Sequence, residues 1–352
     1  MVITSFEYHE FKWDLTSVPI GSLNLIVGKN AVGKSKTLAS LVQVAKVIKG
    51  DVGNVYMRHQ CKMAFRLDGN DELEYSYAMG NNKEIESEYL KKGEETILRR
   101  NGAETWIRED SVNPPTNKLC IQSWRDTEKY PEFEAIMRWA EQVKGFSFSN
   151  MSQSNSFLVP SMFNEQMELS SLFEHIDDEK KSFIIKMMRQ LDYDIEKIDS
   201  IPLLDKLNII TLHENGVGMP LLSNTMSNGM LRVFYILSYL VYVSAEEGAK
   251  TLLIDDLGEG LDYSRSKKLS KIVFDYCEQH GIQLIVTSND SFLMNAVELK
   301  HWIILQREKE QVSAICERTH PEMFLKFKRT GLSNFDFFSS DFVYKYLKSQ
   351  EG

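Results

Sequence analysis

The octapeptide Gly28-Lys29-Asn30-Ala31-Val32-Gly33-Lys34-Ser35 decides how the rest of this chain is interpreted. It matches the pattern G-x-x-x-x-G-K-[ST] at every fixed position. Residues 22–27 before it are apolar and β-prone, and residues 37–42 after it have helical spacing. A strand, a glycine-bearing loop and a helix N-terminus together place consecutive backbone N–H groups around a phosphate. The segment therefore predicts binding of a nucleoside triphosphate.

Each fixed residue of this loop has a chemical reason for its type. Gly28 and Gly33 permit close backbone approach and positive φ. Lys34 is expected to reach the β- and γ-phosphates and to assist catalysis, and the Ser35 hydroxyl is expected to ligate Mg²⁺. The alternative is a glycine-rich turn that only resembles the motif. The candidate nucleotide-binding residues here are Gly28, Lys29, Asn30, Ala31, Val32, Gly33, Lys34, Ser35 and Lys36.

The composition indicates an ordinary soluble globular protein. Of 352 residues, 43% are apolar and 26% are charged. The net charge of −9 argues against a surface that is basic throughout, although a local DNA-binding patch stays compatible with it. The four cysteines are widely separated and form no C-x-x-C pair, so we expect them to form neither a metal site nor a disulfide framework. A cytoplasmic location is therefore expected.

No targeting or membrane segment is expected. The N-terminus runs directly into the strand-like residues 2–6 instead of a signal peptide. The longest apolar run, residues 233–243, is too short to span a bilayer. It reads as a helix buried against a sheet.

The predicted secondary structure changes twice along the chain. Residues 62–67, 72–79, 84–90 and 96–100 predict an antiparallel sheet over about 60–108, which Pro114-Pro115 ends. From about 116 to 200 the pattern is helical, with a Ser/Asn-rich loop at 147–156. Strand-like sequence returns at 207–212, and α/β alternation continues to about 318.

A second nucleotide-site motif follows late in the chain. Thr251-Leu252-Leu253-Ile254-Asp255-Asp256 reads as a buried strand that ends in two carboxylates. We expect Asp255 to hold the Mg²⁺ shell and Asp256 to orient or deprotonate the attacking water. The alternative is a polar strand-to-loop transition.

Two further segments refine the class. Residues 226–232 (MSNGMLR) place Ser227 and Gly229 at a helix start, where a hydroxyl and backbone N–H groups can face an anion. Residues 258–262 form a tight loop, and residues 282–290 form another buried strand with a polar end that contains Asn289. Alone, the first segment would be an ordinary N-capped helix.

This order of motifs resembles the ATP-binding-cassette superfamily, in particular the soluble branch with RecF-type repair proteins, SMC heads and OLD-like ATPases. The resemblance extends over nearly the whole chain. Residues 28–35 correspond to Walker A, 227–232 to the signature, 254–256 to Walker B and 260–262 to the D-loop. It implies an α/β fold with an ABC-type P-loop ATPase core, an antiparallel β lobe and a helical insertion.

The resemblance also implies a division of the chain. The expected parts are the N-terminal half of the ATPase core with the β lobe (1–115), the helical insertion lobe (116–205), the C-terminal half of the core (206–320) and an aromatic-rich tail (321–352). Residues 335–347 of the tail are either a core-docking segment or a partner surface.

Two positions depart from the family pattern. Walker B usually ends in glutamate where this chain has Asp256, and the switch histidine is replaced by Asn289, which cannot take up a proton at neutral pH. Both changes are expected to slow hydrolysis and to leave nucleotide binding in place. Gln122 and Gln153 are candidates for the Q-loop glutamine, although each is also explained as polar surface.

In the resembled family, two heads pack head to tail, and each ATP lies between Walker A of one and the signature of the other. The resemblance therefore implies ATP and Mg²⁺ as cofactors and a homodimer or higher homo-oligomer, in which Ser227 and Gly229 act across the interface.

The leading hypothesis is a switch ATPase that controls a separate effector in a bacterial anti-phage defence or nucleic-acid-related system. The alternative is a RecF- or SMC-like ATPase that clamps DNA itself, through Lys180, Lys181, Lys186 and Arg189 or through Arg99 and Arg100. A transporter subunit and a regulatory GTPase are less favoured, because the signature diverges and no N-K-x-D motif is present.

Overall fold

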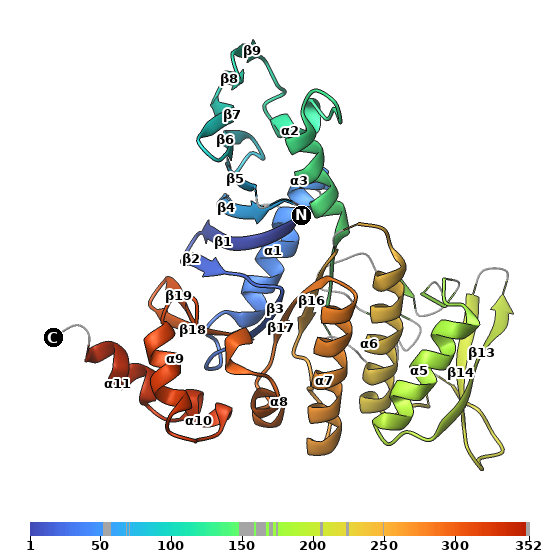
Figure 1. Cartoon of the computed structure of the whole chain (residues 1–352). Coiled ribbons are helices and arrows are strands. Elements are labelled where there is room, and N and C mark those ends of the chain that lie inside the picture. Colours follow the sequence, from blue (N-terminus) through green and yellow to red (C-terminus); the bar gives the residue numbers. More distant parts are fainter. Residues whose placement is uncertain are drawn as a thin grey trace.

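The computed structural model describes residues 1–51, 58–67, 69, 71–147, 158–159, 167–168, 172–173, 175–204, 207–222, 225–248 and 250–349. Within these residues, fourteen strands form one continuous sheet, and helices cover both faces of its central part (Figure 1). This arrangement confirms the predicted α/β class. The four cysteines, all in the described part, are buried free thiols.

The parallel half of this sheet carries the strands that lead to the predicted site. In spatial order they are β10 (Val143–Ser147), β16 (Lys250–Asp255), β17 (Ile282–Thr287), β3 (Leu23–Val27) and β18 (Trp302–Glu308). They are rich in apolar residues because both faces of the sheet are covered. Leu25 and Val27 enter one core, whereas Ile26 between them enters the other. Since the strands are parallel, the motifs that follow them meet at one edge of the sheet.

The other half of the same sheet continues beyond β18. Its strands in spatial order are β19 (Gln311–Cys316), β2 (Trp13–Pro19), β1 (Val2–Glu10), β4 (His59–Arg66), β5 (Glu72–Met79), β6 (Ile85–Lys92), β7 (Glu95–Asn101), β8 (Glu104–Ile107) and β9 (Asp110–Val112). These strands are antiparallel, except that β19 pairs in parallel with β2. The antiparallel sheet predicted over residues 60–108 is therefore confirmed. Strands β4–β9 extend away from the parallel half, beside α2 and α3 (Figure 1).

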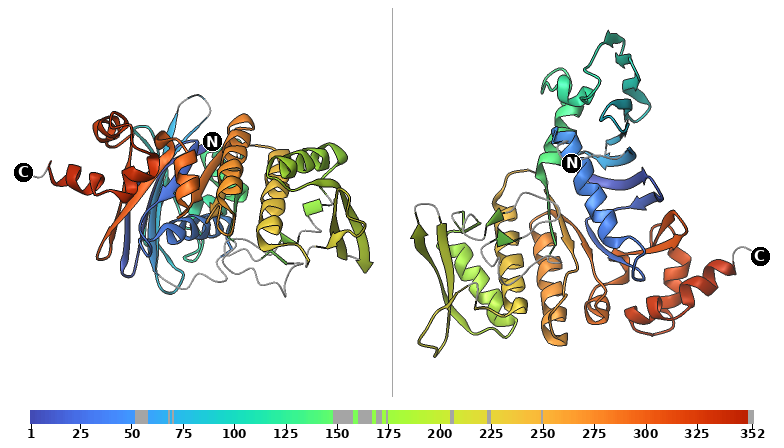
Figure 2. Two further views of the ribbon diagram at one scale, coloured as in Figure 1. Left: turned by 90° about the horizontal axis from the view of Figure 1, so that it is seen from below. Right: turned by 180° about the vertical axis from the view of Figure 1, so that it is seen from behind.

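Two sets of helices sandwich the parallel strands. On one face lie α1 (Lys34–Lys49), α2 (Cys120–Ser123) and α3 (Pro131–Gln142), and on the other α6 (Asn228–Ala245), α7 (Tyr263–Gln279) and α8 (Ser291–Ala296). Figure 2 shows α1 in front of the sheet when the molecule is seen from behind. The apolar run 233–243 lies in α6 and is almost wholly buried, as predicted. Among the described helices, none has the length and apolarity needed to cross a membrane.

The segment 116–205 is more mixed than its helical pattern predicts. Helices α2, α3 and α5 (Asp178–Gln190) are present, and the apolar side chains of α3 are buried. However, β10 belongs to the large sheet, where it pairs with β16. Strands β13 (Ile195–Leu204), β14 (Leu207–Glu214) and β15 (Leu221–Leu222) form a separate sheet. Two-residue strands β11 (Leu158–Val159) and β12 (Met167–Glu168) pair with each other, and most of the predicted loop 147–156 lies outside the described residues.

The described part of the C-terminal tail, residues 321–349, packs against the helical layer that contains α6, α7 and α8. After the short helix η2 (Leu299–His301), β18 and β19, it forms α9 (Pro321–Lys328), α10 (Asn334–Ser339) and α11 (Phe342–Lys348). Phe337 and Val343 are buried in the same core as α6 and α7. The Phe335 amide donates to Asn295 Oδ1 of α8 at 2.8 Å. Of the two interpretations of residues 335–347, these contacts support core docking. In Figures 1 and 2, these helices lie at the opposite end of the molecule from β13 and β14.

Candidate nucleotide-binding site

The predicted phosphate-binding loop connects β3 to the N-terminus of α1. Gly33 is the N-cap of α1 with φ 111°, a conformation that favours glycine. A Cβ at Gly28 would lie 2.7 Å from Val32 Cγ1 and 3.0 Å from the Leu305 carbonyl oxygen, so this position also excludes a side chain. Ala31 adopts φ 63°, a left-handed conformation that the motif did not predict and that costs about 1 kcal/mol for a non-glycine residue.

Lys34 folds back over the loop. Its Nζ donates to the carbonyl oxygens of Gly28 at 2.8 Å and Lys29 at 3.3 Å, and the residue is only 6% exposed. Burial lowers the pKa of its ammonium, whereas the carboxylates of Asp256 and Asp255 act in the opposite direction. The lysine of the first motif therefore lies within electrostatic reach of both carboxylates of the second.

The two aspartates differ although they are adjacent. Asp255 ends β16 and is 2% exposed, and its Oδ1 accepts a hydrogen bond from the Thr287 hydroxyl at 2.6 Å. Asp256 is half-buried and left-handed, with φ 53°. Burial raises the pKa of Asp256, the negative charges of Asp255 and Glu259 raise it further, and the cations of Lys34 and Arg232 oppose the rise. Asp256 is thus the better placed of the two to exchange a proton.

The signature segment packs against the D-loop of the same chain. Ser227 is the N-cap of α6, and its Oγ accepts from the Met230 amide at 3.2 Å, which leaves its hydroxyl proton available for donation. Ser227 is exposed at this helix start. A Cβ at Gly229 would lie 3.2 Å from the Gly260 carbonyl oxygen, so glycine allows the close approach. Arg232 pairs with the Glu259 carboxylate at 3.0 Å.

Comparisons with known proteins give one matching family model and a set of similar solved structures. A family model described as "AAA domain, putative AbiEii toxin, Type IV TA system" matches residues 128–295. That segment holds the signature, Walker B, D-loop and switch positions, and it begins after Walker A. No curated protein sequence matches the chain.

Solved SMC heads align with almost the entire chain. The SMC head domain from Thermotoga maritima gives a TM-score of 0.51 at 11% identity and covers 90% of this chain and 99% of its own. The SMC head bound to the C-winged helix domain of ScpA gives a TM-score of 0.56 at 11% identity. The alignment covers 91% of this chain and 100% of that one. A third structure is the SMC head with an extended coiled coil bound to the C-terminal domain of ScpA, derived from Pyrococcus furiosus. Its TM-score is 0.51 at 10% identity, and the alignment covers 93% of this chain and 99% of that one. By fold, this chain is similar to SMC head domains.

The oxygen donors at the candidate site fit Mg²⁺. The Ser35 hydroxyl lies in the first turn of α1, and the Asp255 carboxylate ends β16, so both are oxygen ligands of the kind that this ion takes. In the described residues, no group of three or more His, Cys, Asp or Glu side chains could hold a metal. A nucleotide-bound Mg²⁺ keeps waters and phosphate oxygens as ligands and needs few protein groups.

The switch position lies between the two motif strands. Asn289 is exposed just beyond β17, which separates β16 from β3. Its neighbours are fixed: the Ser288 hydroxyl donates to the Leu257 carbonyl oxygen at 3.0 Å, and Asp290 contacts the Ser266 hydroxyl of α7. Asn289 is therefore held at the same sheet edge as Lys34 and Asp255.

Gln122 does not reach this edge. Its Nε2 donates to the carbonyl oxygens of Val47 at 2.7 Å and Ile48 at 2.9 Å, at the C-terminal end of α1. Its role is therefore to cap that helix, and the Q-loop interpretation of Gln122 is wrong. Gln153, the other candidate, lies outside the described residues. The chain enters that segment from β10, whose Ser147 is the register partner of Asp255.

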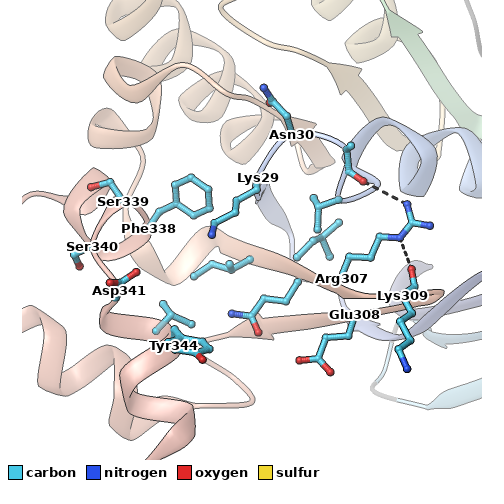
Figure 3. A pocket seen from close by; sticks show the side chains of 16 residues that line it. Lys29, Asn30, Arg307, Glu308, Lys309, Phe338, Ser339, Ser340, Asp341 and Tyr344 are labelled. Atoms are coloured by element: carbon cyan, nitrogen blue, oxygen red, sulfur yellow. Dashed lines mark hydrogen bonds between the residues drawn. The ribbon is translucent and has the colours of Figure 1, made fainter.

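Three other candidate residues point away from Lys34. The Lys36 ammonium contacts the Glu10 carboxylate and lies 4.7 Å from the centre of the Trp13 ring, which leaves its backbone N–H for a phosphate. Lys29 and Asn30 line an open cavity of ≈ 690 Å³ between the loop, β18 and the tail helices (Figure 3).

Sequence reasoning missed two residues that shape the site. The Thr287 hydroxyl bonds the Asp255 carboxylate and the Asp256 backbone amide, and Glu259 pairs with Arg232 of the signature. Glu259 lies within the tight loop 258–262, which was already singled out in the sequence, so a role for it could have been predicted. Thr287 is the last residue of an apolar strand, and because threonine is common in strands its residue type alone did not indicate a special role.

Proposed function

We propose that this chain binds MgATP and hydrolyses it slowly, as a switch whose ATP-bound form is a dimer. One observation carries the proposal: Lys34, Asp255 and Asp256 come together at one sheet edge, where the negative charges of both carboxylates act on the Lys34 ammonium. A phosphate-binding lysine, a buried metal-ligating carboxylate and a proton-accepting carboxylate are the groups that ATP hydrolysis requires.

The residues divide the chemistry among them. Lys34 exchanges its bonds to the loop carbonyls for the β- and γ-phosphates, which are stronger acceptors. Ser35 and Asp255 hold Mg²⁺, which neutralises developing phosphate charge. Asp256 takes the proton of the attacking water, and its raised pKa suits a base. Its side chain is one methylene shorter than glutamate, and Asn289 can orient a phosphate oxygen without supplying a proton, so slow turnover is expected.

The dimer follows from where the signature lies. Ser227 and Asn228 are exposed at the N-terminus of an 18-residue helix, and the contacts of Gly229 and Arg232 are with their own D-loop. The partial positive charge of that terminus favours an anion. A second copy could present its γ-phosphate there, so that ATP itself would hold the closed dimer together.

The controlled component is proposed to be a separate protein in a defence or toxin–antitoxin type of system. The description of the matching family names a type IV TA system, and two of the similar SMC heads are bound to ScpA domains. Three of the basic residues considered for DNA make contacts within the chain itself. Arg100 is 1% exposed and donates to the Lys118 carbonyl oxygen, and Lys180 and Lys181 each pair with an aspartate three residues earlier.

The test is ATP binding by calorimetry. Lys34→Ala should weaken the affinity by about 3 kcal/mol, on the order of 100-fold in Kd, because a charge-assisted contact in a buried site is lost. Lys36→Ala is the matched control, since its ammonium lies on Glu10, and it should retain binding. Equal affinities of wild type and Lys34→Ala would refute the assignment.

A further inference from the structure

We propose that Thr287 is a positioning residue that sets the geometry of both Walker B carboxylates. The inference rests on the proposed nucleotide site and assigns a role to a residue outside all its motifs. Thr287 is the last residue of β17 and is 0% exposed. Because β17 lies between β3 and β16, this residue is placed between the strands that carry Walker A and Walker B.

The Thr287 hydroxyl is used twice. It donates to Asp255 Oδ1 at 2.6 Å and accepts from the Asp256 amide at 2.8 Å. The Thr287 carbonyl oxygen also accepts from the Leu257 amide at 2.9 Å. A single residue therefore bonds three successive residues at the point where β16 ends and the D-loop begins.

Each bond has a consequence for the chemistry. The bond to Oδ1 restricts rotation of the Asp255 carboxylate, as outer-shell donors do for metal-ligating carboxylates. The bond from the Asp256 amide supports a left-handed backbone that an aspartate adopts at a cost, and that backbone decides where its side chain points. One hydroxyl thus orients the Mg²⁺ ligand and the water-activating group together.

Few side chains could replace it. The site needs one atom that donates to a carboxylate and accepts from an amide, which a hydroxyl provides and an aliphatic carbon does not. Valine has nearly the shape of threonine and lacks the hydroxyl, whereas serine keeps it. The pair Thr287→Val and Thr287→Ser therefore separates hydrogen bonding from packing.

The test compares these variants in two measurements. Calorimetry gives the affinity for ATP with Mg²⁺ and with EDTA. Thr287→Val should weaken MgATP binding about 10-fold or more, the usual effect of losing an outer-shell partner, and should leave binding in EDTA unchanged. Thr287→Ser should behave as wild type. Ser288→Ala, which loses a neighbouring buried hydroxyl bonded to Leu257 and not to a carboxylate, controls for stability and should keep the Mg²⁺ dependence.

The second measurement needs no nucleotide. Hydrogen exchange of the Asp256 amide, followed by NMR, should accelerate in Thr287→Val and not in Thr287→Ser. The proposal is overturned if Thr287→Val keeps both wild-type protection of that amide and wild-type MgATP affinity. If the wild type shows no ATP binding at all, the proposed function fails, while the exchange measurement still decides the role of Thr287.

Discussion

Asp255 and Asp256 are neighbours in sequence with different surroundings. Asp255 completes a buried strand, whereas Asp256 leaves it with a left-handed backbone and faces Lys34, Glu259 and Arg232. The first environment suits a fixed metal ligand. The second raises the carboxyl pKa and suits a base.

Replacing Asp256 should separate binding from hydrolysis. In Asp256→Asn, the hydrolysis rate should fall by about 100-fold or more, because general-base catalysis is lost. ATP should remain bound and the dimer closed, whereas Asp255→Asn should weaken Mg²⁺ binding itself. Single-turnover hydrolysis and light scattering measure the two effects. Equal hydrolysis by wild type and Asp256→Asn would place the base elsewhere.

The pH dependence follows from the raised pKa of Asp256. A base acts in its deprotonated form, so the wild-type rate should rise with pH through a value above that of an ordinary aspartate and then level off. The residual rate of Asp256→Asn should lack this rise. Single-turnover rates across pH test it, and a wild-type rate that falls with pH in this range would contradict the assignment.

Residue-level chemistry was the most predictable part of this molecule. Gly33, Lys34 and Asp255 could be recognised because phosphate and Mg²⁺ dictate their types at fixed spacing. The left-handed Ala31 could not, because the motif leaves the residue type at this position open, and the role of Thr287 could not, because it depends on a hydrogen bond to a residue 32 positions earlier. Such contacts leave no local pattern.

At the scale of elements, α2 links the β lobe to the helix that carries Walker A. Glu88 of β6 is 0% exposed and accepts from the Cys120 amide at 2.6 Å and the Tyr75 hydroxyl at 2.9 Å. Two residues later, Gln122 caps the C-terminal end of α1. The lobe is therefore attached to the end of α1 remote from the phosphate loop.

Removing the Gln122 cap should affect stability and spare catalysis. Gln122→Ala leaves two helix carbonyls without this donor and should reduce the free energy of unfolding by about 1–2 kcal/mol. ATP affinity and turnover should hardly change, because Lys34 lies at the opposite end of the 16-residue helix. Urea denaturation and steady-state hydrolysis test this. A Q-loop glutamine would give the reverse result: lost turnover at unchanged stability.

Glu88 should make stability depend on pH. Burial raises its pKa to about 7 from an ordinary value of 4.5, against the opposing hydrogen bonds from Cys120 and Tyr75 and the charge of Arg100. The folded state therefore holds this proton more tightly than the unfolded state. The resulting stabilisation is fully present below pH 4.5 and is lost as the pH rises through about 7. Glu88→Gln should remove this part of the dependence in urea titrations, and an unchanged pH profile would contradict it.

Elements were less predictable where pairing decides them. The helical stretch after residue 116 was read correctly for α3 and α5 but hid β10, a five-residue strand that directly follows α3. Nothing local marks Val143–Ser147 as a strand. It becomes one by pairing with β16, whose sequence lies more than 100 residues away.

At the scale of the whole molecule, one sheet joins both halves of the proposed ATP site. The order β16, β17, β3 brings residues 255, 289 and 28 to one edge, although they are spread over most of the chain. The signature helix belongs to the opposite helical layer from α1, and Gly229 and Arg232 in its first turns lie against the loop 258–262. A complete site is therefore proposed to need a second copy.

This sharing can be tested by complementation. Ser227→Arg should leave ATP binding to the monomer nearly intact, because Walker A still holds the phosphates. It should block ATP-dependent closure, since a bulky cation at the start of α6 would obstruct the facing γ-phosphate. Lys34→Ala should also lose ATPase activity, but because its phosphate loop is impaired while its signature remains intact. Each variant alone should therefore have little ATPase activity.

Mixing the two variants gives the decisive result. A mixed dimer holds one site with both lesions and one with neither, because each site takes Walker A from one chain and the signature from the other. Activity should then return in part, up to about half that of wild type if one intact site turns over independently. Native mass spectrometry of differently tagged chains would establish that mixed dimers form. If they form and remain inactive, either each chain hydrolyses ATP by itself or both sites must be intact together. A Ser227→Ala chain mixed with wild type separates these cases, because only obligatory coupling of the two sites would silence the wild-type site in that pair.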